Sequence, residues 1–208
     1  MKTILITLPM LLLSIFATAQ TKFEQGMGKA FATWGEGRNT EAAAMFERIA
    51  AAEQGEWLPD YYASLINTIA AFQTQNKDEV FAYLTKAQQA YDNAALKEHN
   101  NAELLVLQAM IHTGYIAHDP MTYGRTLSGK VKELYLKALS LEPENPRAVY
   151  GWAEFELHSA KYFNADIAPI CARIDSAVEL FATFKPKTPF HPKWGADRAI
   201  ATQSECKK

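Results

Sequence analysis

The stretch Lys137-Ala-Leu-Ser-Leu-Glu-Pro-Glu-Asn-Pro-Arg-Ala148 decides the fold class of this chain. It has the pattern of one helix that ends and a second that begins a few residues later. Pro143 cannot continue a helix, because its ring clashes with the preceding turn and it has no N–H to donate. Asn145 can cap the next helix, and Pro146 suits the first helical position, where an N–H is not needed. The stretch therefore predicts a junction between two helices.

Apolar residues at helical spacing extend over the rest of the chain. Phe46 and Ile49 show the pattern near the N-terminus, and Ile170 and Ile174 show it near the C-terminus, as expected for helices that bury one face. We therefore expect an all-α fold in one domain, residues 20–208, with four helical hairpins and a C-terminal capping helix. The hairpins are predicted at 23–54, 59–96, 101–141 and 146–184, the capping helix at 192–206, and an inserted loop at 118–128.

The junction resembles the boundary between two tetratricopeptide (TPR) repeats. Ala138-Leu-Ser-Leu-Glu-Pro-Glu-Asn145 matches the family pattern alanine-leucine-x-leucine-x-proline-x-asparagine. Pro59 and Pro143 lie two units of about 42 residues apart, which is longer than the usual TPR period of about 34. The resemblance implies a right-handed α-solenoid with expanded repeats, in which the first helix of each hairpin lines a concave face.

Taken whole, the chain is similar to small exported TPR-like proteins of Bacteroidetes-type bacteria. The residues that carry this similarity are Asp119-Pro-Met121, the junction at 142–147, and the tail from Phe184-Lys-Pro186 through Pro192-Lys-Trp-Gly195 to Cys206. The similarity implies an exported helical-repeat protein of undetermined biochemical role.

The composition indicates a folded chain that does not bind nucleic acid. Hydrophobic residues make up 49% of the 208 residues, which is enough for a continuous core. The net charge is −2, whereas binding to nucleic-acid phosphates requires a concentrated basic surface.

The first 19 residues are predicted to be a signal peptide. Lys2 supplies a positive start, an apolar run follows, and Ala17-Thr-Ala19 is a small-x-small cleavage site. No cysteine follows the run, so we expect no lipoprotein anchor, and we expect no transmembrane segment after cleavage. The expected location is the periplasm or the exterior of the cell.

The two cysteines, Cys171 and Cys206, are predicted to form a disulfide. Cys171 lies 13 residues before Phe184 and Cys206 lies 12 residues after Trp194, so both lie about 18–20 Å from the turn of an antiparallel hairpin. An oxidising compartment favours the bond. The alternative is a buried Cys171 and a free Cys206.

The sequence predicts no catalytic site, no cofactor and no metal site. It contains no HExxH, Cys-x-x-Cys, P-loop or Gly-x-Ser-x-Gly motif. The alternative is an enzyme whose site is built on the inserted loop, from His112, His118, Asp119, Tyr123 and Arg125.

The concave face implied by the TPR resemblance is the predicted binding site. It is aromatic and nearly free of lysine, which suits capture of a protein or peptide. The alternative is that its side chains complete the core. The predicted groove residues are Phe31, Trp34, Tyr62, Leu65, Ile69, Phe72, Leu105, His112, Arg147, Tyr150, Glu154 and His158.

The expected function is therefore a non-enzymatic protein-binding or peptide-binding module, or a scaffold, in the cell envelope. The partner is a protein or peptide of unknown identity. A self-assembling structural protein that acts through its convex face is the first alternative, and the enzyme described above is the second.

Overall fold

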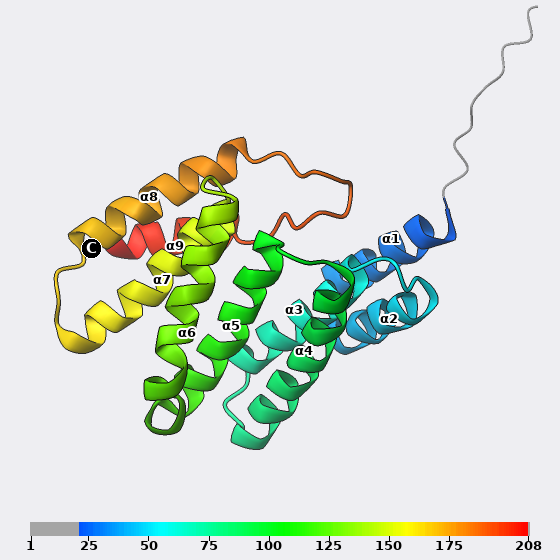
Figure 1. Cartoon of the computed structure of the whole chain (residues 1–208), viewed down its shortest axis with the longest axis horizontal. Coiled ribbons are helices and arrows are strands. Elements are labelled where there is room, and N and C mark those ends of the chain that lie inside the picture. The colour runs from blue at the N-terminus through cyan, green and yellow to red at the C-terminus, as the bar shows by residue number, and fades with distance from the viewer. Residues whose placement is uncertain (1–20, 208) are drawn as a thin grey trace, which may run out of the picture.

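The computed structural model describes residues 21–207, and in that range the chain is entirely helical apart from turns and one long connection (Figure 1). The predicted signal peptide, residues 1–19, lies outside the described residues. The helices are α1 (Lys22–Gly35), α2 (Asn39–Ala52), α3 (Leu58–Gln73), α4 (Lys77–Lys97), α5 (Ala102–His118), α6 (Pro120–Leu141), α7 (Pro146–Phe163), α8 (Ala168–Thr183) and α9 (Ala196–Cys206).

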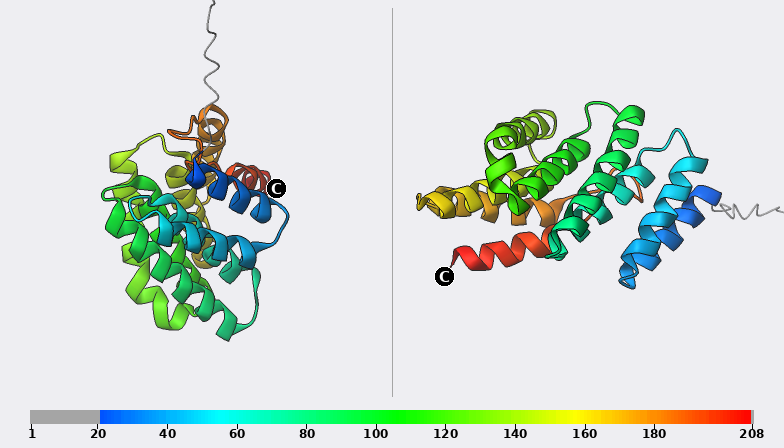
Figure 2. Two further views of the ribbon diagram at one scale, coloured as in Figure 1. Left: turned by 90° about the vertical axis from the view of Figure 1, so that its right-hand side faces the viewer. Right: turned by 90° about the horizontal axis from the view of Figure 1, so that it is seen from below.

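The helices pack in consecutive pairs, α1 with α2, α3 with α4, α5 with α6, and α7 with α8. The first helices also contact one another, since α3 packs on α5 and α5 packs on α7. Figure 2 shows the pairs following one another in a row, with α9 beside α7 and α8. The expected all-α fold of four hairpins and a final helix is confirmed, and the TPR character of the repeats stays a prediction.

Asparagine side chains cap the N-termini of three of the helices. The side chains of Asn76, Asn101 and Asn145 accept hydrogen bonds from the first free N–H groups of α4, α5 and α7. These N–H groups have no partner within the helix, so a capping oxygen stabilises the start. The cap predicted at Asn145 is confirmed.

The inserted loop predicted at 118–128 is wrong, because those residues belong almost entirely to helices. Helix α5 continues to His118 and α6 begins at Pro120, so Asp119 alone connects them. The Asp119 side chain accepts a hydrogen bond from the N–H of Thr122 at 3.1 Å. Asp119 therefore caps α6, and Pro120 occupies a position where no N–H is required.

A long connection joins α8 to α9, and we name residues 184–195 the strap. It leaves the end of α8, extends along one edge of the array toward α1 and returns to α9 (Figure 1). Its contacts lie in the first turns of α3, α5 and α7 and on α1. Gly195 ends it with a φ of 108°, a left-handed conformation that glycine adopts without strain.

Helix α9 is fixed to the last hairpin by a disulfide and by polar contacts. The predicted Cys171–Cys206 disulfide is present and joins α8 to α9. Tyr150 and Thr202 share a hydrogen bond of 2.9 Å, and Arg198 donates to Glu154 at 2.6 Å. Helix α9 therefore covers the last hairpin as a capping helix. In residues 21–207, no helix is long and apolar enough to cross a membrane.

The disulfide should contribute measurably to stability. Its cysteines are 35 residues apart, and closing a loop of that length stabilises a folded chain by about 4 kcal/mol in the chain-entropy model. We expect Cys171→Ser/Cys206→Ser to lower the free energy of unfolding in urea by about that amount. A reducing agent should destabilise the parent and leave the double variant unchanged.

Candidate functional site

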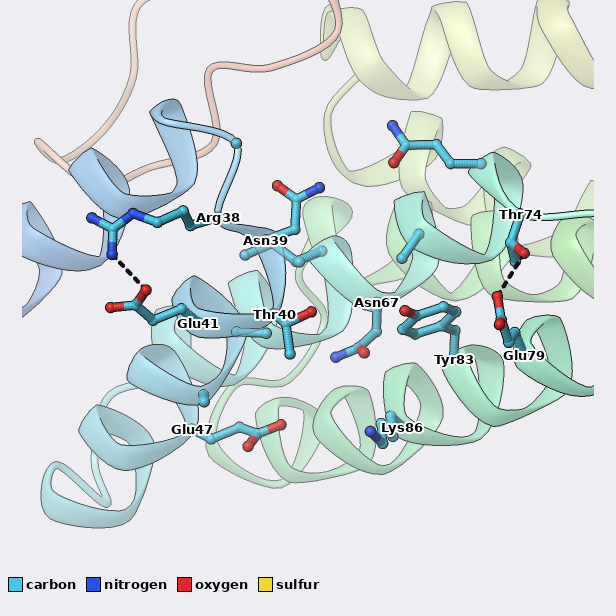
Figure 3. A pocket seen from close by; sticks show the side chains of 16 residues that line it. Arg38, Asn39, Thr40, Glu41, Glu47, Asn67, Thr74, Glu79, Tyr83 and Lys86 are labelled. Atoms are coloured by element: carbon cyan, nitrogen blue, oxygen red, sulfur yellow. Dashed lines mark hydrogen bonds and ion pairs between the residues drawn. The ribbon is translucent and has the colours of Figure 1, made fainter. Parts of the chain in front are cut away.

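An open groove of about 700 Å³ lies between α2 and α4 (Figure 3). Helix α3 packs against both and lies between them. The volume falls in the range of about 300–1,000 Å³ that is typical of small-molecule sites. The groove is lined by Gly37, Arg38, Asn39, Thr40, Glu41, Ala43, Ala44, Glu47, Ile66, Asn67, Ala70, Gln73, Thr74, Glu79, Tyr83 and Lys86.

Small side chains keep this groove open. Ala43 and Ala44 on α2 face Ile66 and Ala70 on α3, so the helices pack closely at the base and leave space above it. Asn67 is buried beside them and donates to the carbonyl oxygen of Ala63 at 2.8 Å. The groove thus has an apolar base with one amide group in it.

Polar and aromatic side chains form the rim of the groove. Arg38 donates to Glu36 and Glu41, and these bonds raise its pKa. Thr74 donates to Glu79 at 2.8 Å. Among residues 21–207, Lys86 makes no ion pair or hydrogen bond, and it lies one turn from Tyr83 on α4. The rim can therefore offer a free ammonium group and an aromatic ring to a ligand.

This groove was not predicted from the sequence, because the predicted site was restricted to the inner faces of the first helix of each hairpin. The groove takes its walls from the second helices, α2 and α4. The available signal was the concentration of alanine in the run Ala42-Ala-Ala44 and in Ala70-Ala71. Such a pattern marks close helix packing but does not show on which side a space remains.

A buried ion pair lies beneath the strap, and neither of its residues lines the groove. Arg147 is 1% exposed and binds Glu103 through two hydrogen bonds, Nε to Oε2 at 2.7 Å and Nη2 to Oε1 at 2.6 Å. The Asn145 amide donates to the same carboxylate at 2.7 Å. The ring of Phe184 covers the guanidinium at 4.4 Å. The pair connects the start of α5 to the start of α7.

The strap is held on this surface by two further hydrogen bonds and by stacked rings. The Tyr62 hydroxyl donates to the carbonyl oxygen of Phe190 at 2.8 Å, and the Trp194 indole N–H donates to the Tyr61 hydroxyl at 2.8 Å. Phe190 stacks on Phe31 with ring centroids 5.9 Å apart. Burial raises the pKa of both tyrosines, so they stay neutral donors and acceptors.

His191 is the titratable group of the strap. It is buried, and its Nε2 lies 3.8 Å from Oε1 of Glu103 without a hydrogen bond. Burial lowers its pKa, Arg147 and Lys187 lower it further, and Glu103 and Glu142 oppose them. The imidazole is therefore neutral at neutral pH.

The predicted groove residues do not form one open surface. Tyr62, Leu65, Arg147 and Tyr150 are buried, and the strap and α9 cover the region that contains Tyr62, Arg147 and Tyr150. The C-terminal segment thus covers part of the predicted concave face, and the burial of these four side chains fits the alternative that they complete the core. Phe31, Trp34, Ile69, Leu105, His112 and Glu154 are half-buried, and Phe72 and His158 are exposed. Binding at these positions stays a prediction.

Two of the residues proposed for an enzyme site, Asp119 and Tyr123, make contacts that hold helices in place. Asp119 caps α6 and pairs with Lys77 at 3.4 Å. Tyr123 packs against the rings of Phe81 and Tyr115. Within residues 21–207, no group of three His, Cys, Asp or Glu side chains could hold a metal ion. The loop on which that site depended is a helix.

Comparisons with known proteins find a similar structure but no related sequence family. No known family matches the chain, and no curated protein matches it. The HusA haemophore from Porphyromonas gingivalis has a similar structure, with a TM-score of 0.78 and 23% sequence identity. The match covers 91% of this chain and 94% of HusA. The two proteins share a fold.

Removal of one partner of the buried ion pair should strongly destabilise the chain. We expect Glu103→Gln to lower the free energy of unfolding by about 3–5 kcal/mol, because the guanidinium stays buried without its counter-charge. The double variant Glu103→Leu/Arg147→Met should lose less than the sum of its single variants in urea unfolding. Strict additivity would contradict this role of the pair.

The strap histidine should make stability depend on pH. The pKa of His191 in the folded chain lies below its unfolded value near 6.5, so the unfolded chain binds more protons as the pH falls. The stability that neutral His191 contributes is fully present above about pH 6.5 and is lost progressively as the pH falls below that value. We expect the parent to lose more stability between pH 7 and pH 5 than His191→Gln does. If the parent and His191→Gln lose equal stability between pH 7 and pH 5 in urea unfolding, His191 is not the group responsible.

Proposed function

We propose that this chain is an exported, non-enzymatic binding protein that captures a haem-like ligand in the groove between α2 and α4. The observation that carries the proposal is the likeness in fold to a haemophore, which extends over 91% of the chain. The predicted signal peptide and the disulfide support an exported protein.

The groove can receive a flat ligand on its base and a ligand carboxylate at Lys86, although Glu41, Glu47 and Glu79 also line it. Its base is made by small apolar side chains such as Ala44 and Ala70, which allow a planar ligand to lie close to the helices. Lys86 is free to pair with a carboxylate, whereas Arg38 is already paired with Glu36 and Glu41. Tyr83 adds an aromatic side chain to the wall. Burial of the ligand's apolar surface would supply most of the affinity.

Capture of a protein or peptide partner is the second candidate function. The observation that favours it is that the first turns of α3, α5 and α7 already hold a non-helical segment, the strap. The concave-face module expected from the sequence would then act through the surface that the strap covers.

The haem proposal is tested by titrating ferric haem into the chain of residues 20–208 and following the Soret absorbance. We expect saturation at one haem per chain. Ala44→Arg should weaken binding at least tenfold, because its side chain fills the groove. Ala51→Arg is the matched control, since it lies two turns further along α2, is exposed and lies outside the groove.

Two outcomes would contradict the proposal. If haem binding does not saturate at a defined ratio of haem to protein, haem adsorbs to the surface and does not occupy a specific site. Equal affinity of the parent and Ala44→Arg indicates that haem binds elsewhere. A parallel titration with iron-free protoporphyrin separates recognition of shape from ligation of the iron.

A further inference from the structure

The strap is held by side chains rather than by its backbone. In the described part of the chain, no backbone–backbone hydrogen bond joins residues 184–194 to a helix, and the backbone bond within the strap joins His191 to Thr188. Lys185 to Pro189 are exposed. Segments with few backbone hydrogen bonds and much exposed surface belong to the parts of a protein that open most readily.

The strap and the surface under it are complementary in charge and in ring content. The strap carries Lys185, Lys187 and Lys193, and Lys187 pairs with Glu142. The surface supplies the carboxylate of Glu142 and the rings of Phe31, Tyr61 and Tyr62, which contact Phe190 and Trp194. The surface therefore suits a non-helical segment that carries a lysine and two aromatic side chains four positions apart.

The match between strap and surface leaves polar atoms unpaired. Nη1 of Arg147 and Nε2 of His191 are buried without a hydrogen-bond partner. A buried donor without a partner costs about 1–3 kcal/mol. A segment that placed a carbonyl oxygen against Nη1 of Arg147 would satisfy a donor that the strap leaves without a partner.

We propose that this surface is a peptide-recognition surface, that the strap is its resident occupant, and that its partner is a non-helical segment with a lysine and with aromatic residues four positions apart. The proposal rests on the second candidate function and names the chemistry and the regulation of that site. The strap acts as an intramolecular competitor.

The geometry of the tether sets the strength of this competition. The strap is joined to α8 at one end and to α9 at the other, and the Cys171–Cys206 disulfide fixes α9 to α8. An occupant that is part of the chain acts at a high effective concentration. A partner binds only the fraction of molecules in which the strap is open, so its apparent affinity rises when the strap is weakened.

The test uses a fluorescein-labelled peptide with the sequence of residues 184–195 and the chain of residues 20–208. We expect it to bind Phe190→Ala at least tenfold more tightly than the parent by fluorescence anisotropy, because this variant loses the ring that packs the strap on Phe23 and Phe31. Phe163→Ala is the matched control, since Phe163 is an exposed phenylalanine on α7 with no contact to the strap. It should bind the peptide as weakly as the parent does.

A second substitution places the peptide on the proposed surface. Adding Tyr62→Phe to Phe190→Ala removes the hydroxyl that donates to the strap carbonyl and should weaken peptide binding. Circular dichroism and urea unfolding confirm that each variant is folded. Equal binding to Phe190→Ala and Phe163→Ala, or equal binding of a scrambled peptide, would overturn the proposal.

The haem titration and a pull-down separate this inference from the functions on which it rests. If the parent and Phe190→Ala retain the same amount of a protein partner in the pull-down, the chain captures a partner but the strap does not compete with it. A chain that binds haem but no peptide would overturn this inference and leave the haem site in place.

Discussion

The buried pair of Glu103 and Arg147 is the interaction on which the arrangement of the C-terminal half depends. A carboxylate and a guanidinium excluded from water are tolerated only when each is paired and hydrogen-bonded. The two side chains meet only if the first turns of α5 and α7 lie side by side, so the pair fixes how the third and fourth hairpins are placed. Asn145 both caps α7 and donates to the same carboxylate, which connects the start of a helix to the pair.

The strap follows from the need to cover this pair. Phe184 covers the guanidinium, and the rings of Phe190 and Trp194 close the edge toward α1 and α3. The C-terminal segment thereby covers part of the concave face that was predicted as the binding site. The groove between α2 and α4 stays open because no segment of the described chain crosses it. The surface under the strap is thus covered, whereas the groove between α2 and α4 is open.

Several elements could be predicted because their signals are local. Asn145-Pro146 marked a helix start, and the cysteines could be paired by counting residues along two antiparallel helices. Asp119-Pro120 carries the same kind of helix-start signal, but residues 118–128 interrupt the TPR pattern, and this interruption led to the prediction of a loop. The partner of Arg147 lies 44 residues earlier, and helical periodicity predicts a buried face without naming what meets it. The strap has no periodicity, so its contacts with Tyr61 and Tyr62 could not be inferred.

The two surfaces differ in what binding costs, and this difference separates the ligands they can take. The groove is already open, so a rigid ligand of the proposed kind would bind there without rearranging the chain, and its affinity would depend on apolar contact and on Lys86. The surface under the strap must first be vacated, and a ligand there has to exceed the tethered occupant in hydrogen bonds and ring contacts. A small planar molecule offers few such contacts, whereas an extended segment can replace each one. The open groove therefore favours a small ligand, and the covered surface favours a chain segment.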